Sequence, residues 1–186
     1  MYGIVNRGLE ELILREHGEE VWLDILESAD VDIDGFVSLQ SYPDALTVKL
    51  VVAIAEYKGM SAEEVLIHFG EYWTTYTRMR GFGPILNLEQ GSLEDVLRNL
   101  GQMHRRVRTS MPQMRPPSFV VHGPEQGVFR IEYHSERDGL GGFVVGVFRS
   151  LMRLKGVQGE VVWSERRSEG APLDVFELRI ASQRAA

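Results

Sequence analysis

The sequence contains no cysteine, and this absence excludes several kinds of site together. Disulfide bonds, thiolate metal ligands, iron–sulfur clusters and nucleophilic cysteines all depend on the missing thiol group. Covalent attachment of a cofactor through a CxxCH motif is excluded for the same reason. A cytoplasmic location is the default expectation for a chain of this composition.

Long apolar runs are also missing. No stretch of 18 or more apolar residues occurs, so the sequence predicts no transmembrane helix. The first twelve residues lack the basic patch, the apolar run and the cleavage site that are typical of a signal peptide. Hydrophobic residues make up 44% and charged residues 25% of the 186 positions, a balance that suits one globular domain.

Positive charge is scarce in the first half of the chain. Residues 1–90 contain 6 Lys/Arg and 16 Asp/Glu, a net charge of −10, whereas residues 91–186 contain 14 and 11, a net charge of +3. The acidic first half argues against general nucleic-acid binding. The basic excess of the second half could receive an anionic ligand, although a solvated surface is the commoner meaning of such an excess.

Hydrophobic periodicity predicts helices through the first hundred residues. The expected helices span residues 2–16, 19–29, 44–57, 61–76 and 92–109. Ser61 with Glu64, and Ser92 with Asp95, have the spacing of residues that cap helix N-termini. The segment RGFGP at 80–84 is expected to break the fourth helix.

The character of the sequence changes after residue 110. Three prolines exclude a helix over residues 110–119. One further helix and four strands are expected beyond them, the helix at 140–155 and the strands at 119–122, 128–133, 157–165 and 175–180. The segment HGPEQG should turn between the first two strands, and the last two alternate like a hairpin. The expected fold class is therefore α+β, with a helical lobe followed by a lobe that contains an antiparallel sheet.

Most motifs that indicate catalysis or metal binding are missing. Five histidines are present, but no HExxH motif, paired ligand spacing or carboxylate–histidine cluster indicates zinc. The nucleophile-elbow, P-loop and dinucleotide-binding motifs are missing too. The segment GLGGF at 139–143 follows a charged loop rather than a strand, so it is weak evidence for a phosphate site.

His104 lies on the apolar side of the fifth expected helix. It follows Leu100 by four residues and Leu97 by seven, so it shares their buried stripe. A buried neutral imidazole needs partners for two ring nitrogens. Two interpretations stay open: a core histidine bonded to the backbone, or an axial ligand of haem iron whose other nitrogen binds a carbonyl or a water.

Tyr133, Ser135 and Arg137 form a second candidate site. In an extended segment these three side chains point the same way. Two hydroxyls beside a guanidinium fork suit a pair of carboxylates, such as the propionates of a non-covalent haem. The alternative is the polar outer face of a strand.

Five segments together resemble one protein family. They are MYGIVNRGLEEL at the start, FGEYWTTYT at 69–77, NLGQMHRRV at 99–107, MRPPSF at 114–119 and the YxSxR motif at 133–137. They resemble the haem–nitric oxide/oxygen binding (H-NOX) domains, the bacterial relatives of the haem domain of soluble guanylate cyclase. The resemblance covers essentially the whole chain. It implies the H-NOX fold, with a helical distal lobe at about residues 1–60 and a proximal lobe with helices and a four-stranded antiparallel sheet at about 61–186.

The resemblance also implies roles for individual residues and a non-covalent haem b as cofactor. His104 matches the axial ligand of the iron, and the YxSxR motif matches the propionate clamp. Pro117 matches a proline that presses on the porphyrin and helps to distort it. Asp44 matches an acid that pairs with the clamp arginine and fixes its guanidinium.

The distal pocket is expected to decide which gas binds. Members of the family that hold O2 carry a distal tyrosine after the YxSxR motif. This chain has Gly142 and Phe143 at the candidate positions, and neither side chain can donate a hydrogen bond. The other expected distal residues are Val5, Leu9, Trp73 and Val147. Trp73 could donate through its indole N–H or could only pack, so the prediction is NO and CO binding without a stable O2 complex.

The implied function is that of a gas sensor without catalytic activity. Its output would pass to a histidine kinase or to a cyclic-di-GMP synthase or phosphodiesterase in trans, with no nucleic-acid or membrane partner. The alternatives are an O2-binding H-NOX protein, a haem-occupancy sensor, a haem-free interaction module and a haem peroxidase. The last is disfavoured because no distal His/Arg pair suited to O–O cleavage is found. The acidic lobe around Glu10 and Glu11 is a hypothetical docking face.

Overall fold

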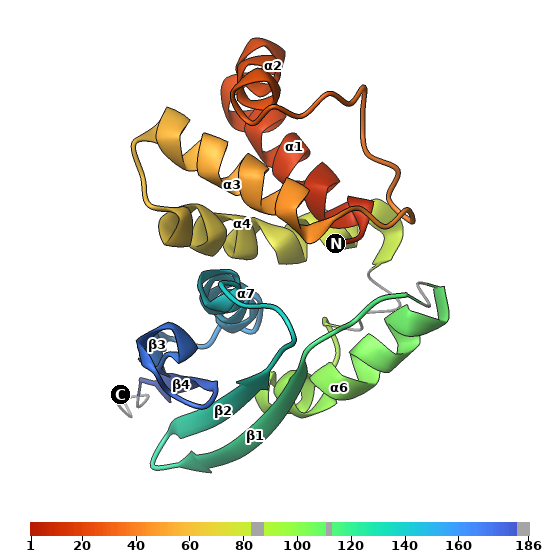
Figure 1. The fold of residues 1–186 in the computed structure, drawn as a ribbon. Coiled ribbons are helices and arrows are strands. Elements are labelled where there is room, and N and C mark those ends of the chain that lie inside the picture. The colour runs from red at the N-terminus through yellow and green to blue at the C-terminus, as the bar shows by residue number, and fades with distance from the viewer. Residues whose placement is uncertain (83–87, 111–112, 182–186) are drawn as a thin grey trace.

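The computed structural model of the chain describes residues 1–82, 88–110 and 113–181. Two lobes are stacked in it (Figure 1). The first lobe is helical and contains α1 (Gly3–His17), α2 (Glu19–Ser28), α3 (Asp44–Lys58) and α4 (Ala62–Thr77). The second contains α6 (Leu93–Ser110), α7 (Gly141–Leu154) and a sheet. In the part of the chain described, every helix is too short or too polar to cross a membrane.

Local sequence signals explain where the helices begin and end. Ser61 caps α4: its hydroxyl accepts from the Glu64 N–H at 3.2 Å, and its own N–H donates to the Glu64 carboxylate at 2.8 Å. Ser92 and Asp95 repeat this arrangement before α6. The break expected at 80–84 begins at Gly81, where φ is +82° inside the π-helical turn η1 (Arg78–Phe82) that follows α4. Residues 83–84 lie outside the described residues.

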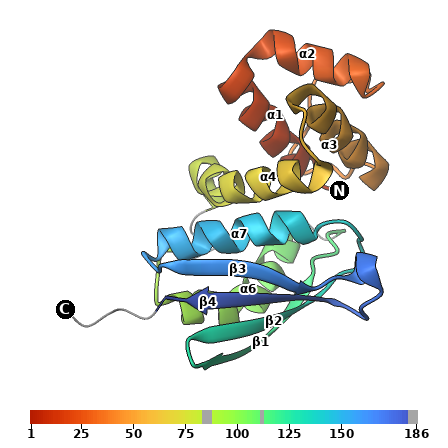
Figure 2. The ribbon, with the colours of Figure 1, turned by 90° about the vertical axis from the view of Figure 1, so that its left-hand side faces the viewer.

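The sheet has four antiparallel strands, as expected, and their order is β1-β2-β4-β3 (Figure 2). The strands are β1 (Ser118–Glu125), β2 (Val128–His134), β3 (Gly159–Glu165) and β4 (Asp174–Ile180). β1 is longer than predicted, because pairing resumes at Glu125 after a register shift that begins at His122. The expected turn HGPEQG therefore shrinks to Gln126 and Gly127, whose φ values of 49° and 81° suit a tight hairpin.

Two clusters of buried side chains hold the molecule together. The first joins α1, α2, α3 and α4, and it includes Phe69 and Tyr76 of α4. The second joins α6, α7 and the sheet, with Leu97, Phe148 and Phe176 among its members. The buried hydrophobic residues of α4 all belong to the first cluster. The lobe boundary expected near residue 60 stays a prediction.

α4 and α7 touch backbone to backbone where the lobes meet. A Cβ atom added to Gly70 would lie 2.2 Å from the carbonyl oxygen of Phe143. One added to Gly146 would lie 2.0 Å from the carbonyl oxygen of Ile67. Both distances are far below van der Waals contact, so only glycine permits this approach. The approach brings Trp73 of α4 within 5.7 Å of the Phe143 ring, measured between ring centroids.

Replacing Gly146 by alanine should force α4 and α7 apart. Alanine favours a helix by about 1 kcal/mol over glycine, but overpacking costs roughly 1–3 kcal/mol. We expect a net decrease in the free energy of unfolding, measured by chemical denaturation. Gly101→Ala in α6 is the matched control, because its nearest neighbour, the Arg105 guanidinium, is 3.8 Å from the added Cβ. A Gly146→Ala variant as stable as Gly101→Ala would contradict the close approach.

Candidate functional site

A cavity of about 220 Å3 lies between the two lobes. Folded interiors hold few voids larger than a water molecule, which occupies about 30 Å3 in the liquid. α1, α3 and α4 supply one set of walls, and α6, α7, β2 and residues 114–119 supply the other. Most of the lining side chains are apolar, so the cavity suits a mainly apolar ligand with a few polar groups.

His104 reaches this cavity from α6, whose Leu97 and Leu100 are buried as predicted. Its Nδ1 is buried and has no hydrogen-bond partner among the described residues. Burial lowers the pKa of His104 to about 4, so the ring is neutral at pH 7. The Phe119 ring stacks beside it, with ring centroids 5.9 Å apart. An orphaned buried nitrogen costs roughly 1–3 kcal/mol, and such a group calls for a functional explanation.

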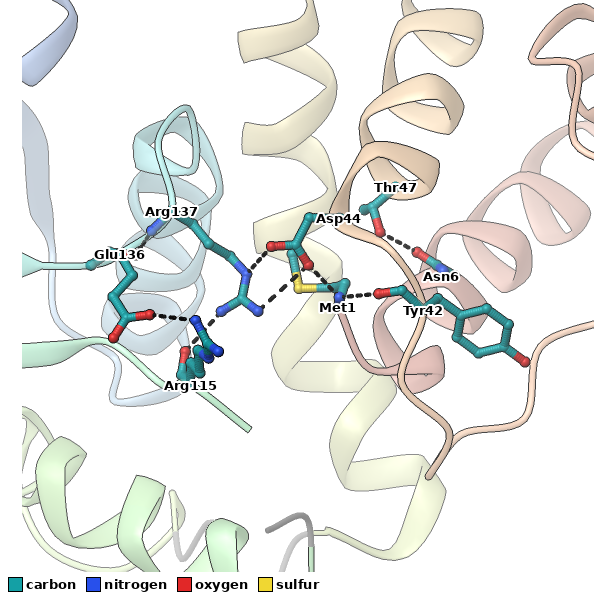
Figure 3. Close-up of polar contacts among 9 residues, drawn as sticks. Met1, Asn6, Tyr42, Asp44, Thr47, Arg115, Glu136 and Arg137 are labelled. Atoms are coloured by element: carbon teal, nitrogen blue, oxygen red, sulfur yellow. Dashed lines mark hydrogen bonds and ion pairs between the residues drawn. The ribbon is translucent and has the colours of Figure 1, made fainter. Parts of the chain in front are cut away.

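The three residues expected to form the propionate clamp also line the cavity. Tyr133 is only 3% exposed, and burial raises the pKa of its hydroxyl, which therefore stays protonated at neutral pH. The Ser135 hydroxyl accepts from the Arg137 N–H at 3.0 Å. The Arg137 guanidinium donates from Nε to Asp44 at 2.7 Å and from Nη1 to the Arg115 carbonyl at 2.8 Å (Figure 3). These contacts hold the guanidinium in one place.

Asp44 binds two cationic groups. Besides Arg137, it accepts from the N-terminal ammonium of Met1, which also donates to the Tyr42 carbonyl at 2.6 Å (Figure 3). Partial burial acts to raise the pKa of Asp44, but hydrogen bonds from the ammonium and from Arg137 outweigh it, and the pKa falls below its usual value. The pair with Arg137 is therefore lost only when the pH drops below the ordinary range of an aspartate.

The other residues singled out from the sequence gather around the same cavity. Pro117 lines it, as do Val5, Leu9, Trp73, Phe143 and Val147. The Trp73 indole packs edge-on against the Phe69 ring at a centroid distance of 5.6 Å. Gly142, the other position considered for a distal tyrosine, instead packs against α4, where an added Cβ would lie 2.9 Å from the Glu63 carbonyl oxygen.

Two threonines that the sequence analysis missed also line the cavity, Thr47 and Thr77. The Thr77 hydroxyl donates to the Trp73 carbonyl at 2.8 Å. The Thr47 hydroxyl donates to the buried amide oxygen of Asn6 at 2.7 Å, so both hydroxyls are engaged within the protein. Helical phase could have found them, because Thr77 follows Trp73 by four residues and Thr47 follows Asp44 by three.

The donor set fits a flat cofactor that brings its own metal. Among the described residues, no group of three or more His, Asp or Glu side chains could hold a metal ion. A single buried imidazole and a fixed guanidinium beside an apolar cavity are the groups that a non-covalent haem requires, one for the iron and one for the carboxylates. The orphaned nitrogen of His104 and the restrained Arg137 therefore suit this group.

Comparisons with known proteins agree with this arrangement. A family model described as Haem-NO-binding matches residues 2–161. Soluble guanylate cyclase gcy-35 of Caenorhabditis elegans is 26% identical over 179 residues, which are 95% of this chain and 26% of that protein. Soluble guanylate cyclase 89Db of Drosophila melanogaster is 24% identical over 146 residues, 78% of this chain and 22% of that protein. The chain thus spans about a quarter of the length of these relatives.

Solved structures show the same fold. An H-NOX protein from S. oneidensis in the Fe(II)NO state superposes with a TM-score of 0.88 at 17% identity, covering 98% of this chain and 100% of that one. The Fe(II) unliganded H-NOX protein from K. algicida superposes with a TM-score of 0.84 at 16% identity, covering 100% of both chains. The predicted α+β architecture is confirmed.

Replacing His104 by leucine should stabilise the cofactor-free protein. Leucine removes the orphaned nitrogen at similar volume, so we expect the free energy of unfolding to rise by roughly 1–3 kcal/mol. The gain should grow from pH 7 to pH 5. Between the ordinary pKa of 6.5 and the folded pKa of about 4, the unfolded chain binds a proton that the folded protein excludes.

Urea denaturation at the two pH values measures this gain. His122→Leu on the exposed face of β1 is the control and should change stability little. A His104→Leu variant that is less stable than the parent protein would show that the imidazole makes a stabilising contact of its own.

Proposed function

The chain belongs to the haem–NO-binding (H-NOX) family, and on this premise we propose that it senses a gas at a ferrous haem b bound non-covalently between its lobes. The observation that carries the proposal is the buried, neutral imidazole of His104, which shares one cavity with the clamp residues. The haem would supply the iron that binds NO, CO or O2. We propose a sensor without catalytic activity of its own.

The polar residues of the cavity would hold the haem. An iron ligand must be a neutral imidazole, and the low pKa of His104 means that no proton has to be displaced at pH 7. Arg137 would bind haem carboxylates through its fork, with the hydroxyls of Tyr133 and Ser135 adding hydrogen bonds. Asp44 would keep the guanidinium in position through its 2.7 Å contact.

The cavity walls favour NO and CO over O2. A stable O2 complex needs a hydrogen-bond donor beside the bound gas, whereas NO binds strongly without one. Val5, Leu9, Phe143 and Val147 offer no side-chain donor. Among the expected distal residues the donor is the indole N–H of Trp73, and Tyr2, which carries a hydroxyl, also lines the cavity. These donors support the alternative of an O2-binding protein.

Visible spectra of the reduced protein test this proposal. We expect the spectrum of five-coordinate ferrous haem under nitrogen, clear shifts with NO and with CO, and no lasting oxy spectrum in air. A persistent oxy spectrum would replace NO sensing by the O2-binding alternative. Rapid loss of haem to apomyoglobin would favour a haem-occupancy sensor, and a protein that binds no haem would refute all three. His104→Leu should lose the axial ligand signature, whereas His122→Leu should keep it.

Pro117 is proposed to press on the porphyrin, because it lines the cavity on the segment that precedes β1. Pro117→Ala removes most of the ring, so we expect a flatter haem in a crystal structure and weaker out-of-plane bands in the resonance Raman spectrum. Pro116→Ala, one residue earlier on the same segment, is the comparison. An unchanged porphyrin shape in the Pro117 variant would remove this role.

The output would come from a separate enzyme. We propose a histidine kinase or a cyclic-di-GMP synthase or phosphodiesterase that acts in trans. The docking face considered around Glu10 and Glu11 is less suitable than the sequence suggested. Glu11 accepts from the Tyr72 hydroxyl at 3.1 Å and pairs with Arg80. Glu10 is partly buried, which raises the pKa of its carboxyl. A charge reversal there would disturb the lobe itself.

A further inference from the structure

The connection between β3 and β4 reaches both lobes. It comprises residues 166–173 and contains the short 3-10 helix η2 (Arg167–Glu169). Figure 2 shows it at the same end of the molecule as the start of α7. The connection lies beyond residue 161, where the match to the family model ends.

Arg167 contacts the segment that carries two of the clamp residues. Its Nη1 donates to the Ser135 carbonyl at 3.0 Å, and its Nη2 lies 2.9 Å from the Asp138 carboxylate. Ser135 therefore accepts two hydrogen bonds, one at its carbonyl from Arg167 and one at its hydroxyl from the Arg137 N–H at 3.0 Å. A residue held at its carbonyl and at its hydroxyl has little freedom to turn.

A buried carboxylate fixes Arg167 in turn. Asp174 is 7% exposed, and its Oδ1 accepts from the Arg167 N–H at 3.0 Å and from the Trp163 indole N–H at 3.1 Å. Asp174 is also the β4 partner of Tyr133 in β2, so the network reaches two of the three clamp residues. Buried polar networks with satisfied partners are rigid, which suits a positioning role.

Arg166 ties the same connection to the helical lobe. It forms two hydrogen bonds with Glu63, in the first turn of α4, at 2.6 and 3.2 Å. Its guanidinium carbon lies 4.0 Å from the centroid of the Trp163 ring. A bidentate pair that also stacks on an aromatic ring is better defined than an ordinary surface ion pair. The start of α7 rests on this tryptophan, since a Cβ added to Gly141 would lie 2.1 Å from the Trp163 ring.

We propose that the β3–β4 connection is a positioning device for the clamp. Arg167 fixes the position of Ser135. The Arg166–Glu63 pair couples the position of α4 to the β3–β4 connection, and so to Ser135. Arg167 and Arg166 are positioning residues, because they act on the ligand through the clamp rather than touching it. The effect on haem rests on the proposed function, whereas the effect on the segment 135–138 does not.

Arg167→Gln tests the first part. Loss of its bond to the Ser135 carbonyl should speed amide hydrogen exchange over residues 135–138 in the haem-free protein. In the haem-bound protein it should speed haem transfer to apomyoglobin about fivefold, which corresponds to one hydrogen bond worth about 1 kcal/mol. The propionate-bending band in the resonance Raman spectrum should shift as well, which a loss of stability alone would not cause.

Arg179→Gln is the matched control. Arg179 also lies in the last hairpin and pairs with Glu160 and Glu177 at 3.1 and 2.9 Å, but it makes no contact with the clamp among the described residues. We expect it to leave exchange at 135–138, haem transfer and the Raman band unchanged. Equal effects of Arg167→Gln and Arg179→Gln would overturn the positioning role of Arg167.

Glu63→Gln tests the transmission through α4. It removes the negative partner of Arg166 and touches no clamp residue, yet it should also speed exchange at 135–138. If Arg167→Gln speeds this exchange and Glu63→Gln does not, the coupling to α4 is refuted. If neither variant does, the whole proposal is refuted, even where haem binding itself is intact. If the protein binds no haem, the exchange experiment still decides the role of the connection.

Discussion

The backbone contact between α4 and α7 sets the geometry on which the rest of the molecule depends. Gly70 and Gly146 allow the two helices to approach until a methyl group would no longer fit between them. α7 lies along the sheet, and α4 belongs to the core of the helical lobe, so this one contact fixes how the lobes face each other (Figure 2). The cavity walls follow, because Trp73 on α4 and Phe143 on α7 meet beside the crossing.

The cavity that results lowers the stability of the protein when no ligand fills it. It leaves a large apolar void and an imidazole whose Nδ1 has no described partner. Neither feature improves stability, since voids lose packing contacts and orphaned polar atoms lose hydrogen bonds. Natural proteins keep such features where function demands them. Other polar groups of the lining have partners, since Asp44 restrains Arg137 and neighbouring groups accept from the two threonine hydroxyls.

Much of this arrangement could be predicted from short-range sequence patterns. The helix starts at Ser61 and Ser92 could be predicted because a cap involves only four neighbouring residues. His104 could be placed in the core from its phase relative to Leu100. The clamp residues line one cavity as predicted, but not through extended alternation, because β2 ends at His134 and Ser135 and Arg137 lie in the bend that follows it. The extra length of β1 was missed because the register shift depends on pairing with β2, and the contacts of residues 166–173 were missed because their partners are distant in sequence.

Some of the acidic residues of the first half of the chain form ion pairs with arginines of the second half where the two lobes meet. Three acidic residues of the helical lobe form ion pairs with arginines of the second half of the chain: Asp44 with Arg137, Glu63 with Arg166, and Glu71 with Arg153. Each pair is partly exposed, and such pairs contribute at most about 1 kcal/mol. Glycine packing and apolar burial must therefore hold the lobes together. The ion pairs act on orientation, because opposite charges on the two lobes favour one relative position.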